Sequence, residues 1–166
     1  MIADDIKQIL HLIPHPEGGS YTQTYKAVER IPIEALGNDY SGARASSTAI
    51  YYLLEPGTFS EMHRLRSDEI FHFYLGDPVE MLQLCPDGRS RLVQLGPDLA
   101  AGQRPQLVVP KNVWQGSRLI SGGRFALLGC TVAPGFEFDD YESGCRDALI
   151  SAYPEHRDLI TALTRR

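Results

Sequence analysis

The chain has 166 residues, of which 43% are hydrophobic and 22% charged, and its formal net charge at pH 7 is −5. These values are typical of a globular protein and predict one domain over residues 1–166 with a buried core. The negative charge argues against a nucleic-acid partner, which needs a basic surface, and no apolar run is long enough to predict a membrane partner.

The N-terminal residues have the pattern of an amphipathic helix. Ile6, Ile9, Leu10 and Ile13 recur at the i, i+3, i+4, i+7 spacing that places side chains on one helical face. The two prolines that follow are expected to stop this helix. An acidic, amphipathic start is also unlike a secretory signal, which has a basic start and an apolar middle.

The middle of the chain, about residues 20–135, is predicted to form a series of strands. Short apolar or alternating runs are separated by turns rich in Pro, Gly, Asp and Asn. The run "STAIYYLLE" is apolar at both odd and even positions, which predicts a central strand that is covered on both faces. About eight strands at this spacing predict a sandwich or barrel. After Pro134 the pattern returns to helix, and two helices are expected within about residues 143–164.

Three cysteines bear on the compartment and on the core. Cys85, Cys130 and Cys145 are an odd number and include no C-x-x-C pair. Reduced thiols in the cytoplasm are therefore expected. The first two lie in apolar runs, which predicts small core residues rather than reactive thiols.

The stretch "GTFSEMHRLRSDEIFHFYLG", residues 57–76, carries the clearest functional pattern. Gly57 is expected to tighten the turn before a strand with His63, and Glu69 opens the next strand. Because alternate strand residues point inward, a histidine and a carboxylate on neighbouring strands can converge on one point. Such a pair can ligate a metal or act as acid and base.

This stretch resembles the first motif of the cupin superfamily, in which G, five residues, H-x-H, three or four residues, E, six residues and G follow one another. Both glycines, His63 and Glu69 match it, whereas Leu65 stands where the second histidine is expected. The second cupin motif, P-x-G-x-x-H, resembles "PKNVWQ", in which Gln115 replaces the histidine.

The resemblance extends to a branch of bacterial and fungal cupins. Similar segments there correspond to residues 15–21 ("HPEGGSY"), 63–76, 96–106 and 132–142, which together span most of the chain. The resemblance implies a mainly β fold, the cupin double-stranded β-helix or jelly-roll barrel, with a helix before it and helices after it. Because cupins of this kind commonly dimerise, it also implies a homodimer.

The two missing histidines weaken the usual cupin metal site. Zinc and iron sites generally use three or more side-chain ligands, and an amide oxygen from Gln115 is a poor third ligand beside His63 and Glu69. His72 lies three residues after Glu69, which puts the two on opposite faces of a regular strand. We therefore expect no cofactor. A loosely bound divalent metal on His63, Glu69 and Gln115 is the alternative.

Further residues are candidates for the pocket, each with a structural alternative. The segment "HPEGGSY" is either a tight turn before an edge strand or part of the barrel mouth. His72 and Tyr74 of "EIFHFYL" either reach the pocket or pack elsewhere, and the same holds for the "WQ" dipeptide. Phe136 and Phe138 are expected to plug apolar space at one barrel end. The candidates for ligand binding are Glu17, Tyr21, His72, Tyr74, Trp114 and Gln115.

The function predicted from these residues is binding of a small metabolite in a polar pocket lined by His63 and Glu69. Resemblance to metal-free epimerases of deoxysugar nucleotides implies proton transfer on a carbonyl or sugar substrate, an isomerase or epimerase reaction. His63 would be the base and Glu69 would orient it. A metal-dependent cupin oxygenase or lyase, and a binding protein without catalysis, are the alternatives.

Overall fold

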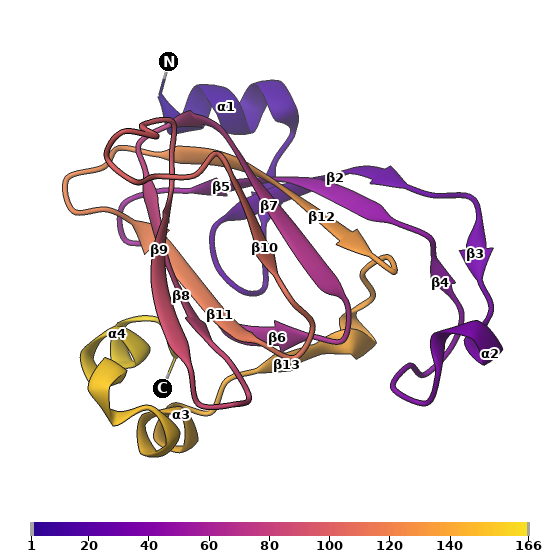
Figure 1. Ribbon diagram of the computed structural model, residues 1–166. Helices are drawn as coiled ribbons and strands as arrows, with labels where there is room; N and C mark the ends of the chain where they lie inside the picture. The colour runs from indigo at the N-terminus through magenta and orange to yellow at the C-terminus, as the bar shows by residue number, and fades with distance from the viewer. Residues whose placement is uncertain (1, 166) are drawn as a thin grey trace.

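Two antiparallel β-sheets face each other in the computed structural model, which describes residues 2–165 (Figure 1). The first sheet contains, in spatial order, β1 (Ile13–Pro14), β2 (Ser20–Lys26), β5 (Thr48–Leu54), β12 (Ala126–Ala133), β7 (Asp68–Gly76) and β10 (Gln106–Val109). The second sheet contains, in spatial order, β13 (Tyr141–Ser143), β6 (Phe59–Leu65), β11 (Trp114–Leu119), β8 (Val79–Leu84) and β9 (Ser90–Leu95). The predicted jelly roll is confirmed, although the strands that face each other pair as two separate sheets rather than as one closed barrel.

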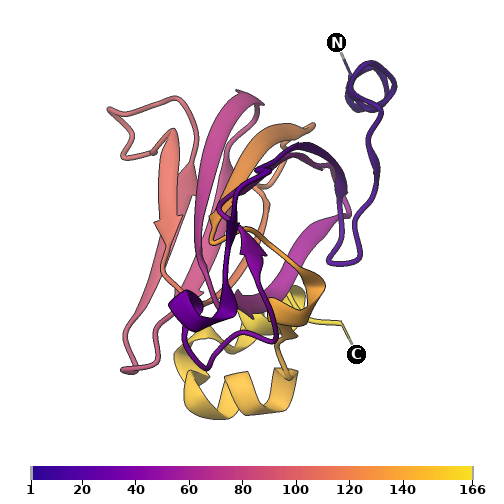
Figure 2. The same ribbon diagram turned by 90° about the vertical axis from the view of Figure 1, so that its right-hand side faces the viewer.

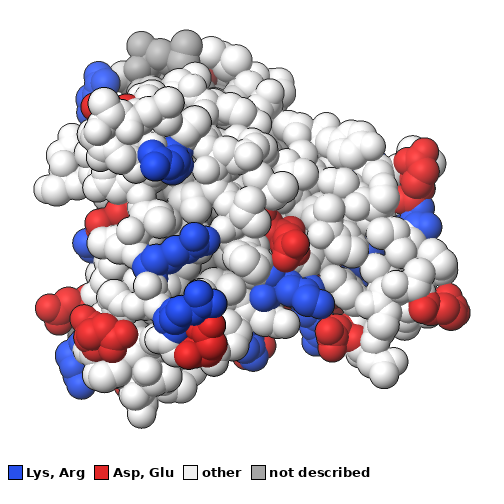
Figure 3. Space-filling view, viewed as in Figure 1, with Lys and Arg blue, Asp and Glu red and all other residues white. Residues whose placement is uncertain are grey.

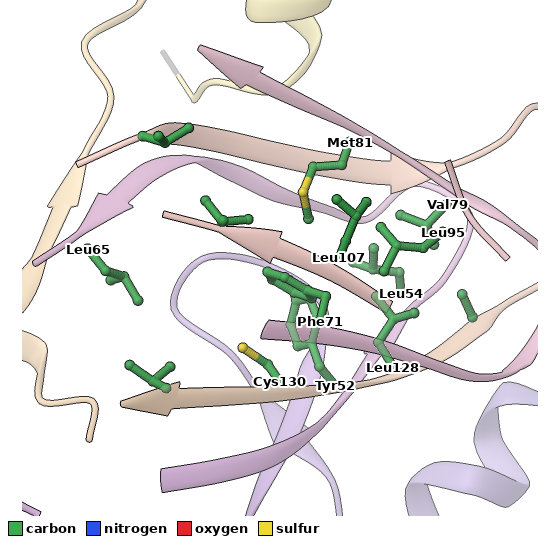
Figure 4. Close-up of a cluster of buried hydrophobic side chains, with 14 residues drawn as sticks. Tyr52, Leu54, Leu65, Phe71, Val79, Met81, Leu95, Leu107, Leu128 and Cys130 are labelled. Carbon is green, nitrogen blue, oxygen red and sulfur yellow. The ribbon is translucent and has the colours of Figure 1, made fainter. Parts of the chain in front are cut away.

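An apolar cluster extends along the space between the sheets (Figure 4), and five of its residues gather toward one end of that space. Leu54 and Leu128 reach it from the first sheet, and Val79, Met81 and Leu95 reach it from the second. All five side chains have no exposed surface. We call these five residues the packed end of the interior.

Strand β5 has apolar side chains on both faces because both faces are covered, as the sequence predicted. Its side chains alternate, so Tyr52 and Leu54 point into the space between the sheets. Leu53 points outward and packs with Ile6 of the helix α1 (Ala3–Leu10). The helix thus covers the outer face of the first sheet.

The predicted N-terminal helix is correct, but its predicted length is wrong. Helix α1 ends at Leu10, because His11 adopts a left-handed backbone conformation with φ 54°. Ile13 instead pairs with Tyr21 in the β1–β2 ladder, and Ile9 is 64% exposed. The prolines therefore follow a helix that has already ended.

The two predicted C-terminal helices are confirmed. Helices α3 (Arg146–Ala152) and α4 (Arg157–Ala162) are joined by a 3₁₀ turn. Leu149 and Ile160 pack against Met62 on the outer face of the second sheet. Figures 1 and 2 show these helices on the side of the molecule opposite α1.

A short arm for which the sequence predicted no element projects from the sheets (Figures 1 and 2). It contains β3 (Arg30–Ile31), α2 (Ile33–Leu36) and β4 (Arg44–Ala45). Arg44 is buried and forms an ion pair with Asp140, with Nε 2.6 Å from Oδ2. This pair ties the arm to the segment that follows β12.

Three observations bear on location and partners. Basic and acidic side chains are interspersed on the face of the molecule seen in Figure 3. Within residues 2–165, no helix is both long and apolar enough to span a membrane. Cys85, Cys130 and Cys145 are free thiols. The cytoplasmic location, the homodimer and the absence of a nucleic-acid partner stay predictions.

Candidate functional site

A polar cluster lies toward the other end of the interior from the packed end. His63 on β6 lies directly opposite Gln115 on β11 in the strand register. Glu69, near the start of β7, reaches the same place from the facing sheet. Glu17 comes from the loop between β1 and β2. Four segments that are distant in the sequence thus supply one cluster.

The loop that carries Glu17 depends on glycine. A Cβ atom at Gly18 would collide with the carbonyl oxygen of Phe59, and its φ of 110° is disfavoured for other residues. The close approach lets the backbone N–H of Glu61 donate to the carbonyl oxygen of Glu17, at 3.1 Å. The Tyr52 hydroxyl donates to the carbonyl oxygen of Gly18, at 2.8 Å. The segment "HPEGG" is therefore a turn that fixes Glu17 over the interior.

His63 is a fully buried histidine that lies between two carboxyl groups. Its Nδ1 is 2.7 Å from the carbonyl oxygen of Glu61, which can only accept, so Nδ1 carries a hydrogen. Its Nε2 lies 3.6 Å from Oε2 of Glu17 and 3.8 Å from Oε2 of Glu69. Only Nε2 can therefore gain or lose a proton. The Tyr141 ring stacks on the imidazole at 5.2 Å.

The two carboxylates favour the charged form of His63. Burial lowers the pKa of His63, but the charges of Glu17 and Glu69 outweigh it and raise the pKa to about 9. The amide nitrogen of Gln115 lies 3.2 Å from Nε2, which would suit a neutral imidazole, and it also donates to Glu69. Because the carboxylate charges dominate, the imidazolium form prevails at neutral pH.

Burial disfavours the charged form of the Glu17 carboxyl group. Burial raises the pKa of Glu17 to about 7, against the positive charge of His63, which lowers it. Near neutral pH this side chain therefore exists in both its acid and its base form. A group with this property is suited to proton transfer.

Cys130 contacts the carboxyl oxygen of Glu69 that faces away from His63. Its thiol donates to Oε1 of Glu69, with a distance of 2.6 Å between Sγ and the oxygen. Burial and the neighbouring carboxylate raise the pKa of the Cys130 thiol well above its usual value. The thiol is therefore protonated at neutral pH and serves as a hydrogen-bond donor, which disfavours a role as nucleophile.

A cavity of about 100 Å³ opens beside the two carboxyl groups. Its wall combines polar and aromatic side chains, and among residues 2–165 no lysine or arginine lines it. Gln23 and Phe138 are exposed and mark its mouth. The lining residues are His15, Glu17, Tyr21, Gln23, Thr48, Ile50, Tyr52, Ser60, Glu69, Phe71, Cys130, Val132, Phe136 and Phe138.

Five of the predicted site residues gather at this place. Glu17, Tyr21 and Glu69 line the cavity. His63 and Gln115 do not line it, but both contact the carboxyl group of Glu69. The carboxyl groups are therefore the part of the cluster that a ligand can touch.

Three predicted pocket residues lie elsewhere. His72 lies on the outer face of β7, with Nε2 3.4 Å from the Thr131 hydroxyl, and Tyr74 stacks on its ring at 6.4 Å. Trp114 lies beneath the Arg64 guanidinium, 4.5 Å from it, and packs with the C-terminal helices. The alternation of side chains along each strand turns all three away from the cavity.

His15 and the two phenylalanines complete the wall. His15 was not among the predicted site residues, although it begins the "HPEGG" turn and lies two residues before Glu17. That position in the turn was the available signal. Phe136 and Phe138 pack edge to face, with their ring centroids 5.0 Å apart. Phe136 packs against the apolar core, as the sequence predicted for both rings, whereas Phe138 is 55% exposed.

The donor set at this site does not fit a cupin metal. No group of three His, Cys, Asp or Glu side chains within residues 2–165 is arranged to hold a metal ion. Leu65 occupies the place of the second histidine and belongs to the apolar core. Gln115 directs its amide nitrogen, which cannot ligate a metal, toward His63 and Glu69.

Known proteins of similar sequence point to one family. The family model described as "Cupin superfamily (DUF985)" matches residues 4–144. The chain is 31% identical over 138 residues to "Uncharacterized protein YML079W" of Saccharomyces cerevisiae, an alignment that covers 78% of this chain and 69% of the yeast protein.

Solved structures agree with this match. Protein SO0799 from Shewanella oneidensis has a TM-score of 0.86 at 39% identity, covering 99% of this chain and 98% of that one. A hypothetical protein from Leishmania major has a TM-score of 0.88 at 30% identity, with full coverage of both chains. Oxalate decarboxylase from Bacillus subtilis shares only the fold, with a TM-score of 0.53 at 12% identity over 94% of this chain and 37% of that one.

Proposed function

The chain belongs to the DUF985 family of the cupin superfamily, and from this premise we propose that its cavity binds a small metabolite and moves a proton on it. The reaction is the isomerisation or epimerisation of a carbonyl or sugar-like compound, without a metal. The main support is the placement of Glu17 and Glu69 on the cavity wall, with the buried His63 imidazole 3.6 and 3.8 Å from their oxygens.

The geometry favours Glu17 over His63 as the base. His63 is 1% exposed and does not line the cavity, so its Nε2 reaches a ligand only through the carboxyl groups. Glu17 lines the cavity and has a pKa of about 7. This proposal differs from the sequence-based hypothesis, in which His63 is the base and Glu69 orients it. His63 becomes a positioning residue whose positive charge holds both carboxylates.

The proposed step is a proton transfer from carbon. The Glu17 carboxylate takes a proton from the carbon next to a carbonyl group, and the electron pair of that C–H bond forms the C=C bond of an enolate. Return of the proton to the other face of the same carbon gives an epimer. Return of the proton to the neighbouring carbon, together with transfer of the hydroxyl proton from one oxygen to the other, gives an isomer. A base whose pKa is near the working pH is the most effective for such a step.

Exchange of carbon-bound hydrogen for deuterium tests this proposal directly. Dihydroxyacetone, hydroxyacetone and glyceraldehyde are small, uncharged probes, and proton NMR in D₂O follows the loss of their hydrogens next to the carbonyl. We expect the wild type to accelerate exchange and Glu17→Gln to lower the rate about 10²–10⁴-fold. The matched control is Glu55→Gln, because Glu55 pairs with Lys7 outside the cavity. Equal rates for Glu17→Gln and wild type would exclude Glu17 as the base.

Elemental analysis separates this proposal from a metal-dependent reaction. We expect less than stoichiometric Zn, Fe or Mn in protein purified without chelator or nickel, and exchange that persists in EDTA. Stoichiometric metal that is lost together with exchange in EDTA would favour the metalloenzyme. Probe binding without exchange would favour a binding protein.

A further inference from the structure

His15 is a second histidine at the cavity, and the proposed proton transfer leaves it without a role. It lies on the cavity wall two residues before Glu17, and its side chain is 6% exposed. Its ring packs edge to face against Tyr21 at 4.4 Å and against Tyr52 at 5.7 Å. The orientation of the imidazole is thus fixed by its neighbours.

The backbone of the turn determines which nitrogen of His15 carries the hydrogen. The backbone N–H of Glu17 donates to Nδ1 of His15, at 3.1 Å. An Nδ1 that accepts a hydrogen bond has no hydrogen, so the neutral ring carries its hydrogen on Nε2. Within residues 2–165, neither a carbonyl nor a side chain accepts a hydrogen bond from this Nε2–H, which leaves it available to a ligand.

The surroundings keep the His15 ring uncharged. Burial, together with the positive charge of His63, lowers the pKa of His15 to about 4, although Glu69 acts in the opposite direction. The two histidines therefore differ in charge at neutral pH. His63 is an imidazolium, whereas His15 is a neutral hydrogen-bond donor.

The cavity wall also limits what the ligand can be. Glu17 and Glu69 disfavour an anion, and neither lysine nor arginine among the described residues lines the wall to offset them. Phosphorylated sugars and carboxylic acids are therefore poor ligands. A volume of about 100 Å³ suits a compound with few heavy atoms.

We propose that the Nε2–H of His15 donates a hydrogen bond to the carbonyl oxygen of a small, uncharged hydroxyaldehyde or hydroxyketone while Glu17 removes the proton from the adjacent carbon. This inference rests on the proposed function and names its substrate class. As the C–H bond breaks, its electron pair forms the C=C bond, and the former carbonyl π electrons move to oxygen. His15 stabilises the negative charge on that oxygen. Glu17 then returns the proton to carbon, so no oxidant or reductant is needed.

The tautomer of His15 is measurable without a substrate. Long-range proton–nitrogen NMR on ¹⁵N-labelled protein, with the His15 signals assigned from their loss in His15→Gln, reports which ring nitrogen carries hydrogen. We expect a neutral ring with hydrogen on Nε2 from pH 5.5 to 8. Hydrogen on Nδ1, or protonation midway near pH 6.5, would overturn the inference whatever the substrate is.

Deuterium exchange with the same three uncharged probes supplies the second measurement. We expect His15→Phe to exchange about 10²-fold more slowly than wild type, and His15→Gln, whose amide keeps an N–H donor, to recover part of the rate. The bend of the pH–rate profile near 7 should persist in His15→Phe, because Glu17 causes it. His72→Phe on the outer face of β7 is the matched control and should exchange like wild type.

The outcomes separate the two proposals. If wild type exchanges and Glu17→Gln does not, but His15→Phe exchanges like wild type, the role of His15 is wrong and the proposed function stands. If the wild type accelerates hydrogen exchange in none of the probes, the proposed function fails and this inference fails with it. Faster exchange of glyceraldehyde 3-phosphate than of glyceraldehyde would contradict the substrate class.

Discussion

The two ends of the space between the sheets are built from the same strands but differ in what fills them. On β5, Leu54 belongs to the packed end, whereas Ile50, four residues earlier and facing the same way, lines the cavity. On β12, Leu128 and Val132 differ in the same manner. Strand alternation therefore determines which side chains face inward, but loops determine whether the inward space is filled.

The difference also concerns energy. The packed end buries apolar side chains with no exposed surface, which stabilises the fold. The cavity end buries Glu17 and raises its pKa to about 7, which means that the folded state disfavours its charge. Conflict of this kind between stability and local chemistry is typical of functional sites.

The largest expected effect comes from truncating matched side chains at the two ends. Leu54→Ala should lower the free energy of unfolding by about 2–5 kcal/mol, because it leaves a void among fully buried neighbours. Ile50→Ala should cost about half as much, because its side chain already borders open space. Urea unfolding of both variants measures the difference. Equal losses would mean that the cavity end is packed as tightly as the other.

Replacing His63 tests what holds the cavity end together. His63→Gln removes the positive charge between Glu17 and Glu69, and we expect a loss of about 2–3 kcal/mol at pH 6.5. His72→Gln, on the outer face of the neighbouring strand, is the control and should change the stability by less than about 0.5 kcal/mol. If both variants lose the same stability, His63 has no special electrostatic role.

Much of the fold could be predicted from the sequence, because hydrophobic alternation and turn residues encode strands directly. The central, doubly covered position of β5 followed from apolar residues at both parities. The end of α1 at His11 could not be predicted, since a left-handed histidine has no strong sequence signal. The arm was missed because its elements are short, and a buried ion pair, Arg44–Asp140, links it to a distant segment.

The site was partly predictable for the same reason. His63 and Glu69 lie on consecutive strands, so their spacing in the sequence was enough to predict that they meet. Strand pairing also places Gln115 directly opposite His63. The sequence did not indicate that His63 is enclosed behind carboxyl groups, because that depends on where a loop folds. The close approach of Gly18 to β6 brings Glu17 into the site, and no periodicity encodes that contact.

The wild-type protein should lose stability as the pH rises from about 6.5 to 9. The pKa of His63 is raised to about 9, so its contribution is complete below the unfolded value of about 6.5 and disappears as the pH passes 9. Below pH 6.5, Glu17 and His15 act in opposite directions and partly cancel. Urea unfolding should show a fall of about 2 kcal/mol across this window. The double variant His63→Gln/Glu17→Gln removes both titrating groups and should flatten the profile, and an unchanged slope in it would assign the fall to other groups.

The smallest expected effect is a gain in stability. Because the folded state raises the pKa of Glu17 from 4.5 to about 7, stability is lost as the pH rises through this range and the carboxyl group ionises. Glu17→Gln removes that loss but also weakens the attraction on His63, so we expect a net gain of about 1 kcal/mol at pH 8. At pH 4.5 the gain should be much smaller, because the Glu17 carboxyl of the folded wild type is already protonated there. Urea unfolding at the two pH values decides the sign. A variant that is less stable than wild type at pH 8 would mean that the Glu17 charge stabilises the fold. Ion pairs would then stabilise the cavity end, and the folded state would not disfavour the charge of the proposed base.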